Sequence, residues 1–181
     1  MINREESERI LEEYIDDDNL RLHCRMVAAA MEAYASDLDL SEEDIEKWWT
    51  AGLLHDLDWE KFPDEHPNKA INDIFPKMDL SNEIIEAIKA HAPERTGKRP
   101  EAEMDKYLFA CDELSGFMNA VSLVRPNGFQ DMKPKSVTKK LKDKRFAENV
   151  SRADIKEGVG MINKELRDHL LFLIEVFKEK P

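Results

Sequence analysis

Cysteine and glycine are scarce in this chain, and long apolar runs are absent. Its 181 residues include only 2 cysteines, Cys24 and Cys111, without CxxC spacing. This argues against a disulfide scaffold and against a thiolate zinc site. No apolar run approaches the roughly 20 residues that span a bilayer, so we expect no membrane association. The first ten residues, MINREESERI, hold no apolar signal core, and we therefore expect a cytoplasmic protein rather than a secreted one.

Basic charge is also in deficit. The chain has 27 Lys and Arg against 39 Asp and Glu, which gives a formal net charge of −12 at pH 7. Proteins that bind nucleic acid polymers normally present a basic surface, so we expect no such partner. The length is sufficient for one hydrophobic core, and no linker or low-complexity stretch divides the chain. We therefore expect a single domain over residues 1–181.

Helical periodicity dominates the sequence, whereas strand-like alternation is hard to find, so we predict an all-α fold. The predicted helices cover residues 5–14, 67–75, 101–124, part of 133–145, and 151–180, and further helices begin at the caps Asn19, Ser41 and Ser81. Residues 92–100 are predicted to form a polar loop. Gly158 and Gly160 favour a kink or a break in the last helix.

Polar residues interrupt the apolar faces of four of these helices. His23, His55 and His91 share the apolar faces of three helices, and Asp112 lies within the apolar segment YLFACDELSGFM. A buried carboxylate is costly unless it is paired or bound to a metal. Because four helices each direct an imidazole or a carboxylate inward, a shared metal cation is the simplest explanation. Asp56 follows His55 at the expected end of its helix, where its side chain can turn toward the same cation.

The order of these residues resembles the HD superfamily of metal-dependent phosphohydrolases. The resemblance rests on the pattern H…HD…D, with the second element within AGLLHDLDWEKFPDEH, and covers about residues 19–125. It implies a compact helical HD-type domain with a metal-binding core at 19–125 and a C-terminal helical extension at 126–181 packed on that core. The segment KPKSVTKKLKDKRFAENVSR resembles the C-terminal part of a group of bacterial and archaeal HD-domain proteins and assigns no chemistry.

The resemblance also implies a set of metal ligands. In the family the first histidine, the HD pair and the last aspartate bind one metal ion, and two intervening histidines hold a second ion in many members. The ligands implied for this chain are His23, His55, Asp56, His66, His91 and Asp112. For His66 the alternative is an exposed loop histidine without a ligand role. Imidazoles and carboxylates without thiolates suit one or two ions of Mn, Fe, Co, Ni or Zn, and suit Mg less well.

The implied reaction is hydrolysis of a small phosphate ester, a nucleotide or a similar mono- or diester, by attack of a metal-activated hydroxide. Asp56 would bridge two ions. Lys61 follows the HD pair, as a phosphate-contacting lysine does in several family members, and Glu60 is a candidate general acid; a solvated acidic loop is the alternative for Glu60.

The candidates for binding substrate phosphate are Arg25, Lys61 and Arg125, with the basic segment 133–145 in addition. Two other functions remain open at this point, a di-iron oxygenase with the same ligands and a non-catalytic sensor of a nucleotide or phosphorylated metabolite. The apolar face of the last helix could form a homodimer or complete the core of the single chain.

Overall fold

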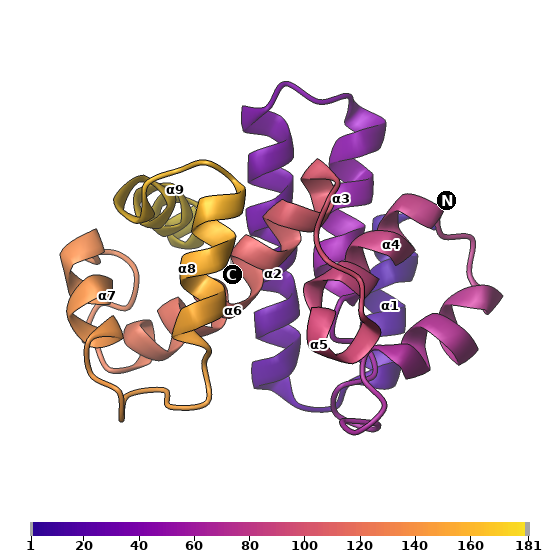
Figure 1. Ribbon diagram of the computed structural model, residues 1–181, viewed down its shortest axis with the longest axis horizontal. Coiled ribbons are helices and arrows are strands. Elements are labelled where there is room, and N and C mark those ends of the chain that lie inside the picture. The colour runs from indigo at the N-terminus through magenta and orange to yellow at the C-terminus, as the bar shows by residue number, and fades with distance from the viewer. Residues whose placement is uncertain (1, 180–181) are drawn as a thin grey trace.

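The computed structural model describes residues 2–179, which form helices joined by turns and loops (Figure 1). The helices are α1 (Arg4–Tyr14), α2 (Asp18–Asp37), α3 (Glu42–Leu54), α4 (Asn82–His91), α5 (Pro93–Thr96), α6 (Glu103–Leu123), α7 (Pro134–Leu141), α8 (Arg152–Met161) and α9 (Leu166–Glu179). A π-helical turn, η1 (Ala70–Ile74), and a 3₁₀ turn, η2 (Phe75–Lys77), lie between α3 and α4. Residues 2–179 contain no strand, so the predicted all-α class is confirmed.

The helices are arranged around α2 and α3, which pack against each other over most of their length (Figure 1). Helix α6 packs against α2 and α4, and α1 packs against α3. The C-terminal helices α7, α8 and α9 gather on one side of the α2–α3 pair, where α8 contacts α6 and α9 contacts α2. The helices after residue 126 therefore extend the same core rather than forming a separate one.

Helices α2 and α3 approach each other unusually closely at one glycine. A Cβ atom on Gly52 of α3 would lie 2.7 Å from the Cα atom of Ala28 in α2, a distance that real Cβ contacts do not reach. Only glycine permits this backbone contact. Because His23 and His55 lie within about one and a half turns of the crossing, the contact also brings these two histidines together.

Some predicted helix boundaries are confirmed and others are wrong. Ser41 and Ser81 cap α3 and α4 as predicted, since their hydroxyls accept hydrogen bonds from backbone N–H groups at the third residue of each helix. Helix α2, however, begins at Asp18, and its cap is Asp17 rather than Asn19. The Asp17 carboxylate accepts hydrogen bonds from the backbone N–H groups of Asn19 and Leu20 in the first turn of α2. Asn19 therefore lies inside the helix rather than at its cap.

The helix predicted over residues 151–180 is divided in two, as Gly158 and Gly160 favoured, but the break follows the glycines. Helix α8 ends at Met161 and α9 begins at Leu166, with Asn163 in a left-handed conformation (φ 51°) between them. Gly158 itself lies within α8, where a Cβ would lie 2.7 Å from the Cα of Ala110, so its role is close packing. Position 180 lies outside the described residues. The predicted loop over 92–100 contains the short helix α5.

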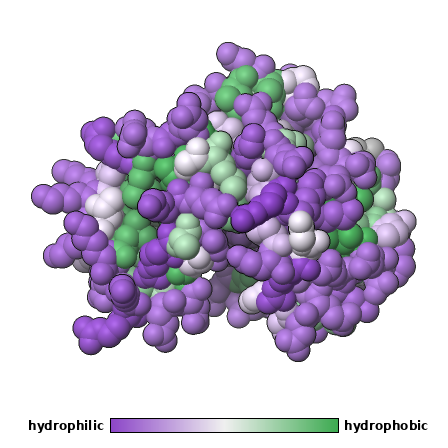
Figure 2. Space-filling model, viewed as in Figure 1, coloured by the Kyte–Doolittle hydropathy of each residue, from purple (hydrophilic) through white to green (hydrophobic). Residues whose placement is uncertain are grey.

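The surface seen in Figure 2 is largely hydrophilic, in keeping with a chain in which 36% of residues are charged. The large apolar side chains that are exposed among the described residues are Trp59, Leu123, Val124 and Leu171. The apolar side chains of α9 are mostly buried against the rest of the chain, so this face of the last helix completes the core. None of the described helices combines the length and apolar character needed to cross a membrane.

Candidate metal centre

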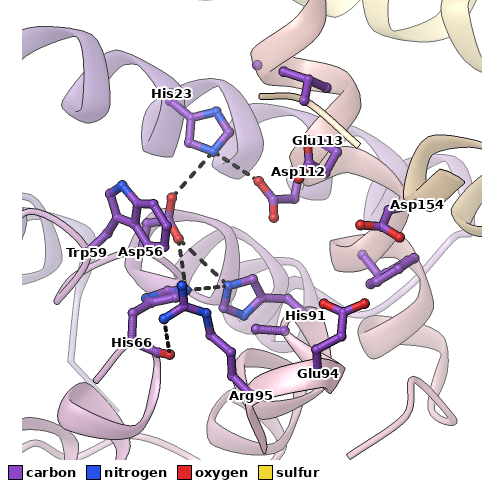
Figure 3. Close-up of a pocket in the computed structure, with 14 residues that line it drawn as sticks. His23, Asp56, Trp59, His66, His91, Glu94, Arg95, Asp112, Glu113 and Asp154 are labelled. Carbon is purple, nitrogen blue, oxygen red and sulfur yellow. Dashed lines mark hydrogen bonds and ion pairs between the residues drawn. The ribbon is translucent and has the colours of Figure 1, made fainter. Parts of the chain in front are cut away.

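Six side chains from five parts of the chain converge at one wall of a cavity (Figure 3). They are His23 of α2, His55 and Asp56 at the end of α3, His66 of the following loop, His91 at the end of α4 and Asp112 of α6. These are the six residues that the sequence singled out as ligands. His66 is buried, so the interpretation of it as an exposed loop residue is wrong.

The first group of donor atoms comes from His23, His55 and Asp112. The Nε2 atom of His23 lies 3.2 Å from Nε2 of His55 and 3.0 Å from Oδ1 of Asp112. Nε2 of His55 lies 3.4 Å from the same Asp112 oxygen. Two ligand atoms that are each about 2.1 Å from one ion are separated by roughly 3 to 3.5 Å. The spacing of the three atoms therefore suits a single transition-metal ion.

The second group comes from Asp56, His66 and His91. Nε2 of His66 lies 3.1 Å from Nε2 of His91. Oδ1 of Asp56 lies 3.4 Å from the His66 nitrogen and 3.7 Å from the His91 nitrogen. These distances are similar to those of the first group, so the second group could hold a second ion.

The Asp56 carboxylate lies between the two groups. Its Oδ1 faces His66 and His91, whereas its Oδ2 lies 3.7 Å from Nε2 of His23 and 3.5 Å from Nε2 of His55. A carboxylate that presents one oxygen to each of two ligand sets is suited to bridge two adjacent cations. The geometry thus accommodates two ions about as well as one.

Hydrogen bonds fix the tautomers of three of the histidines. Nδ1 of His55 donates to the carbonyl oxygen of Gly52 at 2.8 Å, and Nδ1 of His91 donates to the carbonyl oxygen of Ile88 at 2.5 Å. Nδ1 of His66 interacts with Oδ1 of Asp58 at 2.7 Å. Carbonyl and carboxylate oxygens accept hydrogen bonds, so in each neutral ring the proton resides on Nδ1. The Nε2 lone pairs are left to point at the centre of the cluster.

This arrangement is unfavourable without a positive charge at the centre. The Nε2 lone pairs of His66 and His91 face each other at 3.1 Å, and neither neutral ring has a proton to place between them. A metal ion removes the conflict, because imidazole binds metal through this lone pair while the other nitrogen donates to a fixed acceptor. The donor set therefore fits divalent metal binding.

The electrostatics of the cluster also attract positive charge. Burial lowers the pKa of His55, but the facing carboxylates of Asp56 and Asp112 outweigh burial and raise that pKa to about 9. Burial opposes ionisation of the two carboxyl groups as well, yet the neighbouring histidines hold the pKa of Asp56 and of Asp112 well below the ordinary range. Without metal, protons supply the positive charge that the carboxylates require.

One residue that orients this cluster, Asp58, was not predicted from the sequence. Asp58 is fully buried, and besides its contact with His66 it accepts a hydrogen bond from the backbone N–H of Ala70 at 2.8 Å. It links the loop histidine to η1. The signal was present in the sequence HDLD, since a second carboxylate near an HD pair is a candidate partner for a histidine ligand.

The cavity in front of the cluster has a volume of about 330 Å³ and contains one cation that was also missed. Arg95 of α5 is the single Arg or Lys among the described residues that line it. Its Nη1 donates to the carbonyl oxygens of Pro63 and His66, at 2.5 and 3.2 Å. The guanidinium also lies 5.3 Å from the centre of the Trp59 ring. Arg95 falls in the segment that we predicted to be a polar loop, where a basic residue is unremarkable.

The predicted phosphate-binding arginines lie elsewhere. The Arg25 guanidinium pairs with Glu8 at 2.8 Å and Glu12 at 3.1 Å, both on α1. Arg125 pairs with Asp131 at 2.7 Å. Neither residue lines the cavity, and no residue of the basic segment 133–145 does so. Their assignment to substrate is therefore corrected, because their charges are neutralised by neighbours away from the cluster.

Lys61 and Glu60 are also directed away from the cavity. The Lys61 ammonium donates to the carbonyl oxygen of Glu13 at 2.9 Å. The Glu60 carboxylate accepts hydrogen bonds from the backbone N–H groups of Asp16 and Asp17. Lys61 ties the loop after α3 to the last turn of α1, and Glu60 ties it to the connection between α1 and α2. Both residues lie close to the HD pair in the sequence, but their side chains do not line the cavity. The catalytic assignment of Lys61 and Glu60 is therefore corrected.

Glu113 lies beside the cluster, and the pKa of its carboxyl group is raised. Burial raises its pKa, the neighbouring Asp112 carboxylate adds to this, and the resulting pKa is about 7. Its Oε2 accepts a hydrogen bond from the backbone N–H of Ser151 at 3.1 Å, which connects α6 to the start of α8. The C-terminal extension thus contributes to one wall of the cavity.

Comparison with known proteins gave one match. A family model described as HD domain matches residues 21–116, slightly more than half of the chain. This range contains all six residues of the cluster. Searches of curated proteins and of solved structures found no match.

Proposed function

The chain belongs to the HD domain family, and on this premise we propose that it is a metal-dependent phosphohydrolase that cleaves a small phosphate ester, a nucleotide or a similar compound. The observation that carries the proposal is the position of Asp56, which presents one oxygen to each of two histidine groups at the wall of a cavity. Two neighbouring cations are suited to an in-line displacement at phosphorus.

The donor set favours Mn, Fe, Co, Ni or Zn, since imidazoles predominate and thiolates are absent from the cluster. One ion would be held by His23, His55 and Asp112, the other by His66 and His91, with Asp56 shared. When bound, such ions lower the pKa of water toward about 7 and offset the charge of the phosphate.

The contribution of the chain beyond its ligands is to bind and orient the phosphate. Nη1 of Arg95 is held by two backbone carbonyls, while the other guanidinium nitrogens form no hydrogen bond with residues 2–179 and can donate to phosphate oxygens. In the reaction a water oxygen forms a new bond to phosphorus, the ester P–O bond breaks, and the alcohol leaves with a proton. For a monoester the products are the alcohol and inorganic phosphate.

The first test measures metal content and turnover on the same protein. We expect protein purified without chelators to contain about one to two transition-metal ions per chain and to hydrolyse members of a panel of phosphate esters. His55→Ala and Asp56→Ala should lose both metal and turnover, because each removes a donor from the cluster. Asp64→Ala, a change to an exposed acidic residue of the same loop, is the matched control and should retain both.

Two results would contradict the proposal. One is a wild-type protein that binds no metal and is indistinguishable from His55→Ala. The other is a metal-loaded protein that hydrolyses no ester but consumes oxygen when loaded with iron under controlled conditions, which would indicate an oxygenase.

A further inference from the structure

Charges of opposite sign lie on different sides of the cavity (Figure 3). Arg95 reaches the side of His66, whereas the carboxylates of Glu94 and Asp154 lie on the opposite side and that of Glu113 lies beside Asp112. The three acidic residues come from three different helices, α5, α6 and α8. The cavity is thus polarised, with its fixed positive charge near His66 and carboxylates across from it.

Two of these carboxylates are not neutralised by the protein. Glu113 accepts a hydrogen bond from Ser151, as described above. The side chains of Glu94 and Asp154, by contrast, form no hydrogen bond or ion pair with any residue in the described range 2–179. Among the described residues that line the cavity, Arg95 is the only Arg or Lys, and it is engaged near His66. The acidic side of the cavity therefore has a charge that a ligand can complement.

The charge pattern discriminates between classes of phosphate ester. The metal centre and Arg95 attract the phosphate. A second anionic group on the organic part of the substrate would be repelled by Glu94 and Asp154, while a positively charged group would be attracted. The volume of about 330 Å³ is at the small end for ligand cavities, which favours a compact organic group.

We infer that the substrate is a phosphate monoester of an amino alcohol, bound with its phosphate at the metal centre and Arg95 and its ammonium group between Glu94 and Asp154. This inference rests on the proposed phosphohydrolase function and narrows it. It disfavours nucleotides with more than one phosphate. It also gives the C-terminal extension a role, since Asp154 lies outside the matched range 21–116 and supplies part of the specificity.

The test uses three esters of similar length that differ in terminal charge: 2-aminoethyl phosphate, propyl phosphate and 2-carboxyethyl phosphate. With metal-loaded protein we expect kcat/KM to be about tenfold higher for the ammonium ester than for the neutral one, and lowest for the carboxylate ester; a tenfold ratio corresponds to about 1.4 kcal/mol. In the variant Glu94→Gln with Asp154→Asn, the ratio of ammonium to neutral ester should fall to about twofold or less. Glu157→Gln, a change on the same helix to a residue paired with Arg99, should leave the ratio as in the wild type.

A binding measurement complements the kinetics. Calorimetry with 3-aminopropylphosphonate and butylphosphonate, which have no ester bond to hydrolyse, should show the same preference for the ammonium compound and the same loss in the double variant.

The outcomes separate the two proposals. Turnover of all three esters without a charge preference overturns this inference and leaves the phosphohydrolase intact, as does a preference that persists in the double variant. Absence of turnover for these three esters, with turnover of another ester of the wider panel, overturns this inference alone. Absence of turnover for every ester of the wider panel overturns the proposed function and this inference with it.

Discussion

At the scale of single residues, the proton on each histidine decides whether the cluster can bind metal. The backbone carbonyl oxygens of Gly52 and Ile88 accept hydrogen bonds from Nδ1 of His55 and His91, respectively. Each acceptor lies within one helical turn of the histidine that it orients. His66 is in a loop and has no such local acceptor. Its orientation depends on the side chain of Asp58.

Asp58 is therefore the residue whose replacement should weaken metal binding without removing a ligand. We expect Asp58→Asn to lower the affinity for one of the two ions by about 10- to 100-fold, because an amide holds the His66 tautomer less firmly than a carboxylate does. Competition with a chromophoric chelator measures this loss. Asp64→Asn, at an exposed position in the same loop, should have no effect, and an equal loss in both variants would contradict the assigned role.

The charge state of His55 gives a second prediction at this scale. Its pKa of about 9 means that the metal-free protein holds a proton there at neutral pH, whereas the metal-bound ring does not. Binding must release this proton, so the apparent association constant should rise about tenfold per unit of pH between about pH 6 and pH 8. Metal titrations at several pH values check the slope. An affinity that does not change with pH would show that metal binding does not release a proton from His55.

At the scale of secondary-structure elements, the site depends on how closely α2 and α3 approach. The contact of Gly52 with the backbone of Ala28 sets the distance between the helices that provide His23 and His55. Helix propensity alone would favour alanine at this position. The glycine is explained by the tertiary contact.

Gly52→Ala should accordingly reduce both stability and metal affinity. A methyl group at 2.7 Å from the Ala28 Cα forces the helices apart, which we expect to lower the free energy of unfolding by about 1–3 kcal/mol and to separate the two histidines. Gly160→Ala is the matched control, because nothing lies within 4 Å of an added Cβ there. It should raise stability by up to about 1 kcal/mol. Denaturant unfolding of both metal-free variants measures the difference, and equal effects would contradict the packing argument.

At the scale of the whole molecule, a buried histidine connects the C-terminal extension to the helices of the metal site. His169 of α9 accepts a hydrogen bond from the hydroxyl of Tyr34 in α2 at 2.5 Å through Nδ1, and its Nε2 donates to the carbonyl oxygen of Ala110 in α6 at 3.1 Å. The bond from Tyr34 requires the neutral ring, because a protonated Nδ1 has no lone pair to accept it. Sequence analysis gave this histidine no role, because its partners are distant in the chain.

His169 should make the stability of the whole protein depend on pH. Burial lowers its pKa to about 4, below the value of about 6.5 for an unfolded histidine. Between these values the unfolded chain binds the proton and the folded chain does not, so the contribution is complete above about pH 6.5 and is lost as the pH falls toward 4. It amounts to roughly 3 kcal/mol.

Comparison with His169→Gln isolates this contribution from that of the carboxyl groups. The stability of the metal-free wild type minus that of the variant should increase by roughly 3 kcal/mol from about pH 4 to about pH 6.5, since glutamine does not titrate. Denaturation curves across this range provide the measurement. Parallel pH profiles for the two proteins would show that His169 does not account for the acid sensitivity.

The sequence by itself determined the all-α class and four residues that interrupt apolar helix faces, His23, His55, His91 and Asp112. Both follow from local information, because helical periodicity and a polar residue on an apolar face can be recognised without knowing what packs against them. Asp56 was expected from its place at a helix end, and the complete set with His66 was what the resemblance to the HD superfamily implied. The HD pair and its spacing from the other histidines further identified the family, which the match over residues 21–116 confirmed.

Only the tertiary structure decided which charged residues face the cavity. Arg25, Lys61 and Arg125 were reasonable phosphate ligands by position, yet each is held by partners away from the cluster, while Arg95 and Asp154 line the cavity from segments that gave no signal. The physical reason is that an exposed charged side chain takes its direction from whatever the loops and distant helices bring beside it. A buried ligand, by contrast, takes its direction from the face of its own helix.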